Sequence, residues 1–172
     1  DVRDPSSVNQ AFHAAGAVDG VIHFAGLKAV SESVQDPLRY WDVNVNGSRV
    51  LAAAMEAHGC RTLVFSSTST SYGEPDTFPL REDMQTAPVH PYAQTKVAVE
   101  QMLSALCRSG PWRVASLRYF NPVGAHPSGQ IGEDPMGIPN NRFPFITQVA
   151  AGRRERLRIF GQDYPPPDGT GI

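Results

Sequence analysis

The sequence predicts an α/β protein in which a parallel sheet is flanked by helices. Short apolar runs alternate with longer segments of helical periodicity along most of the 172 residues. Asp-Pro pairs, which are typical of helix starts, precede two of the helical segments. Because strands that alternate with helices of this length pair in parallel, the pattern favours a parallel sheet with helices packed on it.

Helix-start and helix-end signals place the first two helices. Asp4-Pro5 predicts the start of one helix, since Asp caps free N–H groups and Pro fits the first helical position, and Gly16 predicts its end. Asp36-Pro37 repeats the signal, and Gly59 ends the segment that follows. Residues recur there at helical spacing, which predicts one continuous helix: Leu38, Trp41, Val45, Ser48, Ala52 and Met55.

Two further helices and four strands complete the expected elements. One helix begins near Tyr92 and carries its apolar residues through Leu106 on one face, and another covers Pro144–Ala151. Apolar runs of strand length predict the strands: Val18–Phe24, Arg61–Ser66, Arg113–Phe120 and Leu157–Phe160.

The composition changes after Asn121. Eight of the fifteen prolines lie beyond it, and residues 121–141 show no apolar periodicity. Loops of that length in compact domains are usually functional or disordered. We therefore expect two domains, with the sheet in residues 1–121 and the start of a smaller, loop-rich, substrate-binding subdomain in residues 122–172.

Composition also limits the partners. The net charge of −2 argues against nucleic acid or an anionic membrane as the main partner, and no apolar run approaches the ~18 residues of a membrane span. Cys60 and Cys107 lack metal-ligand spacing, so we expect no metal site and two small core residues in a cytoplasmic protein. The chain starts with Asp and stops after Ile172, so we expect a piece of a longer protein.

A Tyr-x-x-x-Lys motif is the strongest chemical signal. Tyr92 and Lys96 share a helix face, and only Lys28 and Lys96 among the 15 basic residues are lysines. A neighbouring ammonium favours the phenolate, so such a tyrosine can take a proton from a sugar hydroxyl at neutral pH. On the motif alone, an ordinary exposed Tyr and Lys remain an alternative.

Polar side chains follow each of the first three predicted strands. The strands end in Phe24–Lys28, in the hydroxyl-rich run Ser66–Ser71 and in Tyr119–Pro122. In open α/β sheets, ligands bind outside the carboxyl ends of the strands. The three clusters and the start of the Tyr92 helix are therefore expected to form one binding edge.

The chain resembles the UDP-glucose 4-epimerase family of the extended short-chain dehydrogenase/reductase superfamily, over nearly its whole length. Tyr-x-x-x-Lys belongs to the whole superfamily, whereas Leu117–His126 and Gly137–Asn141 point to the epimerases. The segments that carry the resemblance are His23–Val30, Asn44–Gly47, Phe65–Ser67, Tyr72–Pro75, Tyr92–Lys96, Leu117–His126, Ile131–Asp134, Gly137–Asn141 and Phe160–Gly171.

The resemblance implies a partial Rossmann-type NAD-binding domain and a catalytic trio. Tyr92 would act as the base on the sugar 4-hydroxyl of a UDP-hexose while hydride moves from C4 to NAD and back to the other face of the sugar. Lys96 would lower the pKa of Tyr92 and hold the nicotinamide ribose. Thr68 stands at the position of the family's catalytic Ser/Thr and would hydrogen-bond the reacting oxygen.

The resemblance also assigns binding residues. Beside the catalytic trio Thr68, Tyr92 and Lys96, the positions that match cofactor contacts are Asp1, Val2, Phe24, Ala25, Gly26, Lys28, Asn44 and Phe120. The positions that match substrate contacts are Lys28, Thr68, Tyr92, Asn121, Asn141, Arg142, Arg158, Ile159 and Phe160. A homodimer through the Tyr92 helix and the Leu38–Met55 helix is a further family expectation.

Two alternatives stay open. The family's glycine-rich phosphate loop should precede Asp1 and is absent, so this chain alone is expected to bind NAD poorly and could be a catalytically incompetent fragment. A related NAD-dependent dehydratase or decarboxylase is the second alternative. Related dehydratases place Asp-Glu directly after the hydroxyl residue, whereas Ser69 and Thr70 follow Thr68, which counts against dehydration.

Overall fold

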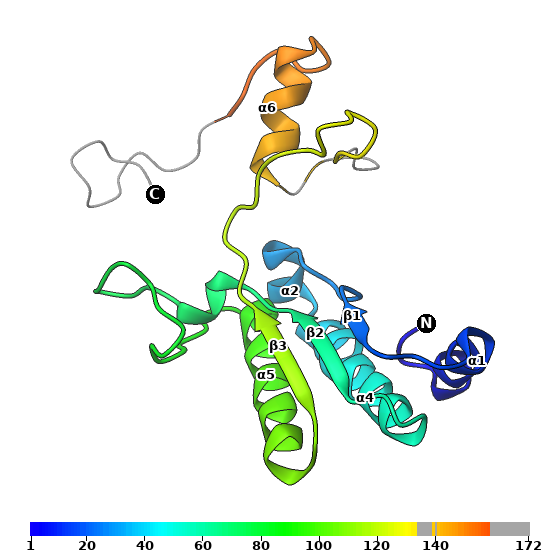
Figure 1. Cartoon of the computed structure of the whole chain (residues 1–172). Helices are drawn as coiled ribbons and strands as arrows, with labels where there is room; N and C mark the ends of the chain where they lie inside the picture. The colour runs from blue at the N-terminus through cyan, green and yellow to red at the C-terminus, as the bar shows by residue number, and fades with distance from the viewer. Residues whose placement is uncertain (134–138, 140, 159–172) are drawn as a thin grey trace. The chain divides into compact units, whose positions relative to one another are not determined.

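A computed structural model describes residues 1–133, 139 and 141–158 of the chain. It divides into two compact units, Asp1–Asn121 and Pro122–Ile172. The first unit carries the sheet and most of the helices, and the second carries a single helix in its described part (Figure 1).

The sheet of the first unit has three parallel strands in the order β1-β2-β3 (Figure 1). They are β1 (Val21–His23), β2 (Thr62–Ser66) and β3 (Arg113–Leu117). Val21 lies opposite Leu63, and each later residue follows in the same register. The predicted parallel α/β arrangement is therefore confirmed, although β1 and β3 are shorter than the sequence predicted. All three strands end at one edge, where the polar clusters begin.

The capping signals act as predicted. Helix α1 (Pro5–Ala15) begins after Asp4, whose carboxylate accepts from the Ser6 N–H at 3.0 Å. It ends at Gly16, where φ is 74° and the N–H donates to the Phe12 carbonyl. A positive φ costs glycine little, which is why the helix stops there.

Helix α5 (Pro91–Ser109) is the longest element, with 19 residues. His90 caps it, because its Nδ1 accepts from the Ala93 N–H at 3.2 Å, and Pro91 takes the first helical position. The cap fixes where the helix starts and so sets the positions of Tyr92 and Lys96 in its first two turns.

The predicted helix from Asp36 to Gly59 is interrupted. Helix α3 (Pro37–Tyr40) passes into a π-helical segment, η1 (Trp41–Asn46), before α4 (Gly47–Ala57) continues. A further short helix, α2 (Val30–Gln35), precedes them and was not predicted. Such π segments are rare and are frequently found at functional sites. Here the segment carries Asn44, whose exposed fraction is only 3%.

The core lies on one face of the sheet. Leu63 and Phe65 point into it from β2, and each is no more than 2% exposed. Helices α1, α4 and α5 supply most of the other members: Val8, Phe12, Val50, Ala52, Ala54, Met55, Val99 and Leu103, with Cys60 and Trp112 from the connections. On β1, Ile22 is 65% exposed, so the described helices do not cover this part of the sheet.

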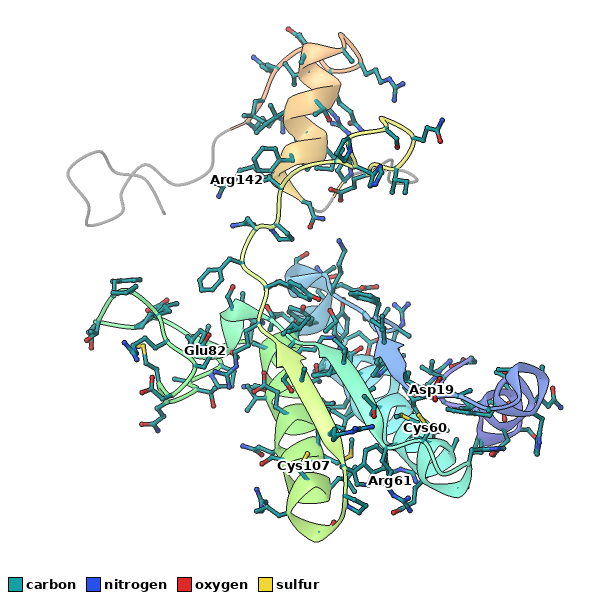
Figure 2. The ribbon with its side chains drawn as sticks, viewed as in Figure 1. Asp19, Cys60, Arg61, Glu82, Cys107 and Arg142 are labelled. Carbon is teal, nitrogen blue, oxygen red and sulfur yellow. The ribbon has the colours of Figure 1, made fainter. Side chains whose placement is uncertain are left out.

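The two cysteines differ. Cys60 is buried in the core, as predicted, whereas Cys107 is exposed on α5 (Figure 2). The prediction of two core cysteines was therefore wrong for Cys107. The described residues hold no cluster of three or more His, Cys, Asp or Glu side chains that could bind a metal ion.

A long excursion leaves the sheet between residues 73 and 89. Its ends meet, because the Ala87 N–H donates to the Ser71 carbonyl at 2.9 Å. Gly73 has φ of 70°, and a Cβ there would lie 2.1 Å from the Ala87 carbonyl oxygen. Only glycine fits this position, so the chain returns to α5 beside the point at which it left.

The second unit contains α6 (Arg142–Ala150), two residues longer at its start than predicted. The Arg154 guanidinium lies 4.9 Å from the Phe145 ring centroid, and its Nε donates to Gln148 at 2.6 Å. The predicted strand Leu157–Phe160 is not formed at Leu157 or Arg158, and its other two residues lie outside the described part. No described helix is long and apolar enough to cross a bilayer.

Replacing a buried leucine of α5 should destabilise the first unit. Leu103 is 1% exposed, so Leu103→Ala should lower the free energy of unfolding by about 3 kcal/mol, through lost apolar contact and a residual cavity. Leu38→Ala is the matched control, since Leu38 is 80% exposed and its loss should cost less than about 0.5 kcal/mol. Urea unfolding followed by circular dichroism measures both, and equal losses would contradict the core as described.

Candidate active site

Three connections and one helix start meet at the carboxyl edge of the sheet. The ladder between β2 and β3 continues beyond the strands, because the Ser67 N–H donates to the Leu117 carbonyl and the Ser69 N–H to the Tyr119 carbonyl, each at 2.9 Å. Backbone bonds therefore hold Thr68 on both sides. The segments that follow β2 and β3 therefore lie side by side at this edge.

Thr68 and Tyr92 face each other across this edge. Thr68 is 6% exposed and caps the short 3₁₀ helix η2 (Ser69–Tyr72), with its Oγ1 accepting from the Thr70 N–H at 3.2 Å. The nearby Thr68 hydroxyl lowers the pKa of the Tyr92 phenol. Burial has the larger, opposite effect, so the pKa of Tyr92 lies above its usual value.

Lys96 is almost fully buried, at 5% exposure. Its Nζ donates to the Ser66 carbonyl at 2.8 Å and lies 5.9 Å from the centroid of the Tyr92 ring. Burial lowers the pKa of Lys96 to about 8. The sequence predicted that Lys96 would lower the pKa of Tyr92. In this structure burial raises the pKa of Tyr92, and the smaller lowering effect comes from Thr68 and not from Lys96.

Asn44 links the loop after β1 to helix α5. Its Oδ1 accepts from the Leu27 N–H at 2.8 Å, and its Nδ2 donates to the Leu27 carbonyl and to Thr95 Oγ1, each at 3.1 Å. Thr95 Oγ1 in turn donates to the Tyr92 carbonyl at 2.7 Å. Asn44, which was predicted to touch a cofactor, therefore positions the loop and the turn of α5 that carries Tyr92.

Gly26 allows the backbone to approach this group closely. A Cβ on Gly26 would lie 3.0 Å from Asn44 Oδ1 and 3.7 Å from Lys96 Nζ. The missing side chain leaves a backbone surface beside a buried amide and a buried ammonium. Such a surface suits the ribose and amide oxygens of a nicotinamide nucleotide, so these residues fit the predicted cofactor.

His23 is a packed histidine at the end of β1. It is 3% exposed, and its Nε2 lies 2.9 Å from Ser48 Oγ, which donates to the Asn44 carbonyl at 2.6 Å. Burial, and then the nearby charge of Lys96, lower the pKa of His23 to about 4. The ring is therefore neutral at pH 7, and its bonds support the π-helical segment.

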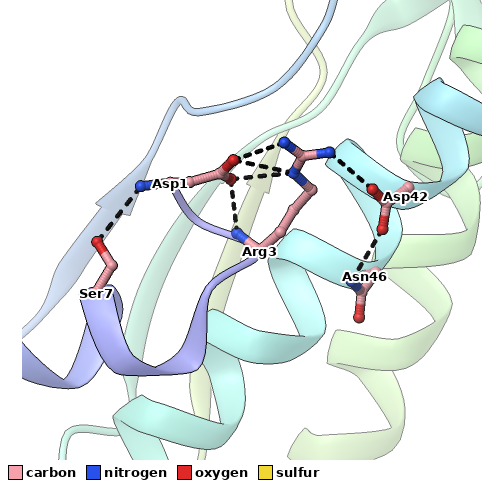
Figure 3. A network of polar contacts seen from close by, with 5 residues as sticks. All are labelled: Asp1, Arg3, Ser7, Asp42 and Asn46. Carbon is pink, nitrogen blue, oxygen red and sulfur yellow. Dashed lines mark hydrogen bonds and ion pairs between the residues drawn. The ribbon is translucent and has the colours of Figure 1, made fainter.

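Asp1 and Val2, the predicted adenine contacts, lie at the start of the first unit. The Asp1 carboxylate accepts from the backbone N–H, Nε and Nη2 of Arg3, and Arg3 Nη1 reaches Asp42 at 2.8 Å (Figure 3). Asn46 Nδ2 also donates to Asp42, at 3.0 Å. A contact between the exposed Asp1 and adenine stays a prediction.

The other predicted site residues are spread over both units. Phe24, Ala25, Lys28, Phe120 and Asn121 are exposed residues of the first unit. Their roles toward a ligand stay predictions. In the second unit the described candidates are Asn141, Arg142 and Arg158, and Arg142 stands at the start of α6 (Figure 2). The candidates Ile159 and Phe160 lie outside the described residues.

Sequence reasoning missed two charged residues of this edge, Glu100 and Arg118. Their ion pair is 2.7 Å long, and the side chains are 12% and 19% exposed. One signal was present, because Glu100 lies four residues after Lys96 and so continues the face of α5 that carries Tyr92 and Lys96. Its partner could not have been found from spacing.

The α/β fold gathers Thr68, Tyr92 and Lys96 at the carboxyl edge of a parallel sheet, the edge at which ligands bind in open sheets of this class. The model of the NAD dependent epimerase/dehydratase family matches residues 1–171, and the chain belongs to this family. It is 53% identical over its whole length to UDP-glucose 4-epimerase 2 of Oryza sativa subsp. japonica, and 52% identical to the UDP-glucose 4-epimerase of Bacillus subtilis.

Solved structures agree with the sequence relatives. The structure of UDP-glucose 4-epimerase from Bifidobacterium longum in complex with NAD+ and UDP matches 99% of the chain at a TM-score of 0.93 and 45% identity. That match covers 51% of the solved chain, and the chain covers 42% of the rice and 51% of the Bacillus relative. The chain therefore spans about half the length of the proteins it matches.

Acid should destabilise the first unit through His23. The unfolded residue titrates near ~6.5 and the folded one at about 4, so the unfolded state binds the extra proton between these pH values. The free energy of unfolding should therefore fall as the pH drops through this window, by up to about 3 kcal/mol.

His23→Gln should reduce this pH dependence, because glutamine has no titrating ring but still donates to Ser48. Unfolding by urea at several pH values between 4 and 7 measures the two slopes, and carboxylates common to both proteins cancel in the difference. Identical slopes would show that His23 does not stay neutral in the folded chain.

Proposed function

We propose that the protein to which this chain belongs interconverts UDP-glucose and UDP-galactose by 4-epimerisation with bound NAD. The observation that carries the proposal is the Thr68–Tyr92–Lys96 trio, gathered at the carboxyl edge of a parallel sheet. Relatives named UDP-glucose 4-epimerase match the chain along its full length at about 50% identity, which supports the same reaction and substrate class.

Tyr92 is proposed as the group that takes the proton from the sugar 4-hydroxyl and later returns it. The Thr68 hydroxyl lies close enough to its phenol to lower the phenol pKa, so both groups can reach one substrate oxygen. In the free chain the pKa of Tyr92 is raised by burial, and Lys96 is bound to the Ser66 carbonyl. An ammonium that stays charged beside the phenol would favour the phenolate and so make Tyr92 a better base.

The residues that would hold NAD are Gly26, Asn44 and Lys96, because the first offers exposed backbone beside the polar groups of the other two. When bound, NAD supplies a hydride acceptor for C4 of the sugar and a donor for the return step. The 172 residues contain no glycine-rich phosphate loop, so we expect this chain alone to bind NAD poorly.

Other parts of the proposal rest on the sequence. The two free thiols, Cys60 and Cys107, favour a protein of the cytoplasm. A homodimer through α5 and the Leu38–Met55 segment is proposed from the family resemblance. A dehydratase is less well supported, since Ser69 and Thr70 follow Thr68 where an acid and base would be needed.

The experiment that tests the reaction is a chimera in which this chain replaces the matching half of the Bacillus subtilis relative. It should convert UDP-galactose to UDP-glucose in the presence of NAD. Tyr92→Phe should lower kcat by about 10²–10⁴-fold, because the proton acceptor is lost. Gln94→Ala is the control, since Gln94 is exposed on the same helix.

A folded, NAD-loaded chimera that fails to convert UDP-galactose, while the parent Bacillus protein does, would reject the proposal. Two parallel assays separate the alternatives. Release of CO₂ from UDP-glucuronate would indicate a decarboxylase, and a product of nucleotide-linked glucose that has lost water would indicate a dehydratase. Full activity of the Tyr92→Phe chimera would remove Tyr92 from the mechanism.

A further inference from the structure

Helix α5 carries a carboxylate on the same face as the two catalytic candidates. Glu100 lies one turn beyond Lys96, which lies one turn beyond Tyr92. The Glu100 carboxylate accepts from Arg118 Nη2 at 2.7 Å and from Arg118 Nε at 3.1 Å. Such a two-pronged ion pair has a fixed geometry as well as a favourable energy.

Glu100 and Arg118 join three separate elements. Arg118 directly follows β3, and Glu100 also accepts a hydrogen bond from the hydroxyl of Ser67, which directly follows β2. One carboxylate on α5 therefore holds the ends of two neighbouring strands. Ser67 is the residue immediately before Thr68.

Arg118 also reaches the far end of the segment that begins at Thr68. Its Nη1 donates to the Tyr72 hydroxyl at 2.9 Å, and its guanidinium lies 4.9 Å from the Tyr72 ring centroid. Tyr72 is the last residue of the 3₁₀ helix that Thr68 caps. The ion pair thus holds the chain before and after Thr68.

The backbone agrees with this arrangement. The N–H groups of Ser67 and Ser69, on either side of Thr68, donate to the carbonyls of Leu117 and Tyr119, on either side of Arg118. Displacement of Arg118 would therefore move both acceptors that fix Thr68. With Glu100 absent, the described contacts left to the guanidinium are the Tyr72 hydroxyl and ring and a 3.4 Å bond to the Glu82 carbonyl, and none of these groups lies on α5.

We propose that Glu100 and Arg118 are positioning residues, which hold the Thr68 hydroxyl in its place beside the Tyr92 phenol. The catalytic meaning of this contact rests on the proposed function, whereas the contact itself can be measured in the chain as it is. An ion pair that served stability alone would leave the Thr68–Tyr92 contact unchanged when it is weakened without unfolding.

The test is the titration of Tyr92 in this chain, followed by NMR of ¹³Cζ-labelled tyrosine, with Tyr92→Phe to assign the signal. The groups packed around the phenol are Thr68, Lys96, which has lost its proton before Tyr92 titrates, and the His90 ring, stacked at 5.9 Å. Thr68→Val is the reference, and its titration midpoint should rise by about half a pH unit because a hydroxyl that favours the phenolate is lost.

Glu100→Gln then separates two explanations by sign. If Glu100 only contributed charge, its loss would favour the phenolate and lower the Tyr92 midpoint. If it positions Thr68, the midpoint should rise as in Thr68→Val. Arg118→Lys keeps the charge but loses the two-pronged bond, so it should also raise the midpoint. Glu56→Gln and Arg108→Lys, at exposed positions, are the matched controls.

Coupling to Thr68 completes the test. In the Thr68→Val background, Glu100→Gln and Arg118→Lys should cause no further rise, because the contact they hold is already lost. A midpoint that stays constant or falls in variants with the circular dichroism of the parent chain would overturn the inference. If Glu100→Gln does not fold, Arg118→Lys decides. The titration does not require activity. An inactive chimera would therefore reject the proposed function, whereas the positioning role of Glu100 and Arg118 would still be decided by the titration.

Discussion

The buried amide of Asn44 is the interaction on which the arrangement of the site depends. A buried amide must find partners for both its oxygen and its nitrogen, and Asn44 finds them on the loop after β1 and on α5. That requirement brings Gly26 beside Lys96 and connects Thr95 to the turn that carries Tyr92. Asn44 lies in the π-helical segment, where it is the buried residue.

Around this amide, burial sets the charges. Tyr92, Lys96 and His23 are all shifted toward their neutral forms, because each loses hydration at the same edge of the sheet. Glu100 and Arg118 keep their charges in the same region, because each forms several hydrogen bonds to the other and to neighbours. The site therefore combines a neutral reacting group with a charged support one helical turn away.

Much of this could be read from the sequence. The caps at Asp4 and Gly16, the parallel strands and the membership of Thr68 and Tyr92 in one edge follow from local signals that act over a few residues. The π segment could not, since the spacing of apolar residues through Leu38–Met55 looks helical whether or not one turn is widened. The pKa of Tyr92 depends on burial, which spacing does not report. The pairing of Glu100 with Arg118 joins residues 18 apart and leaves no periodic trace.

The excursion over residues 73–89 has a consequence for how such a chain can vary. Its ends are joined by the hydrogen bond from the Ala87 N–H to the Ser71 carbonyl and by the close approach of Gly73 to Ala87. The positions of the segments on either side therefore do not depend on the length of the loop between them. Extra residues near the exposed Phe78 would add little loop entropy and would leave Thr68 and α5 in place. New peptide, from natural insertion or from grafting, can therefore be accommodated here beside the catalytic edge without being built into it.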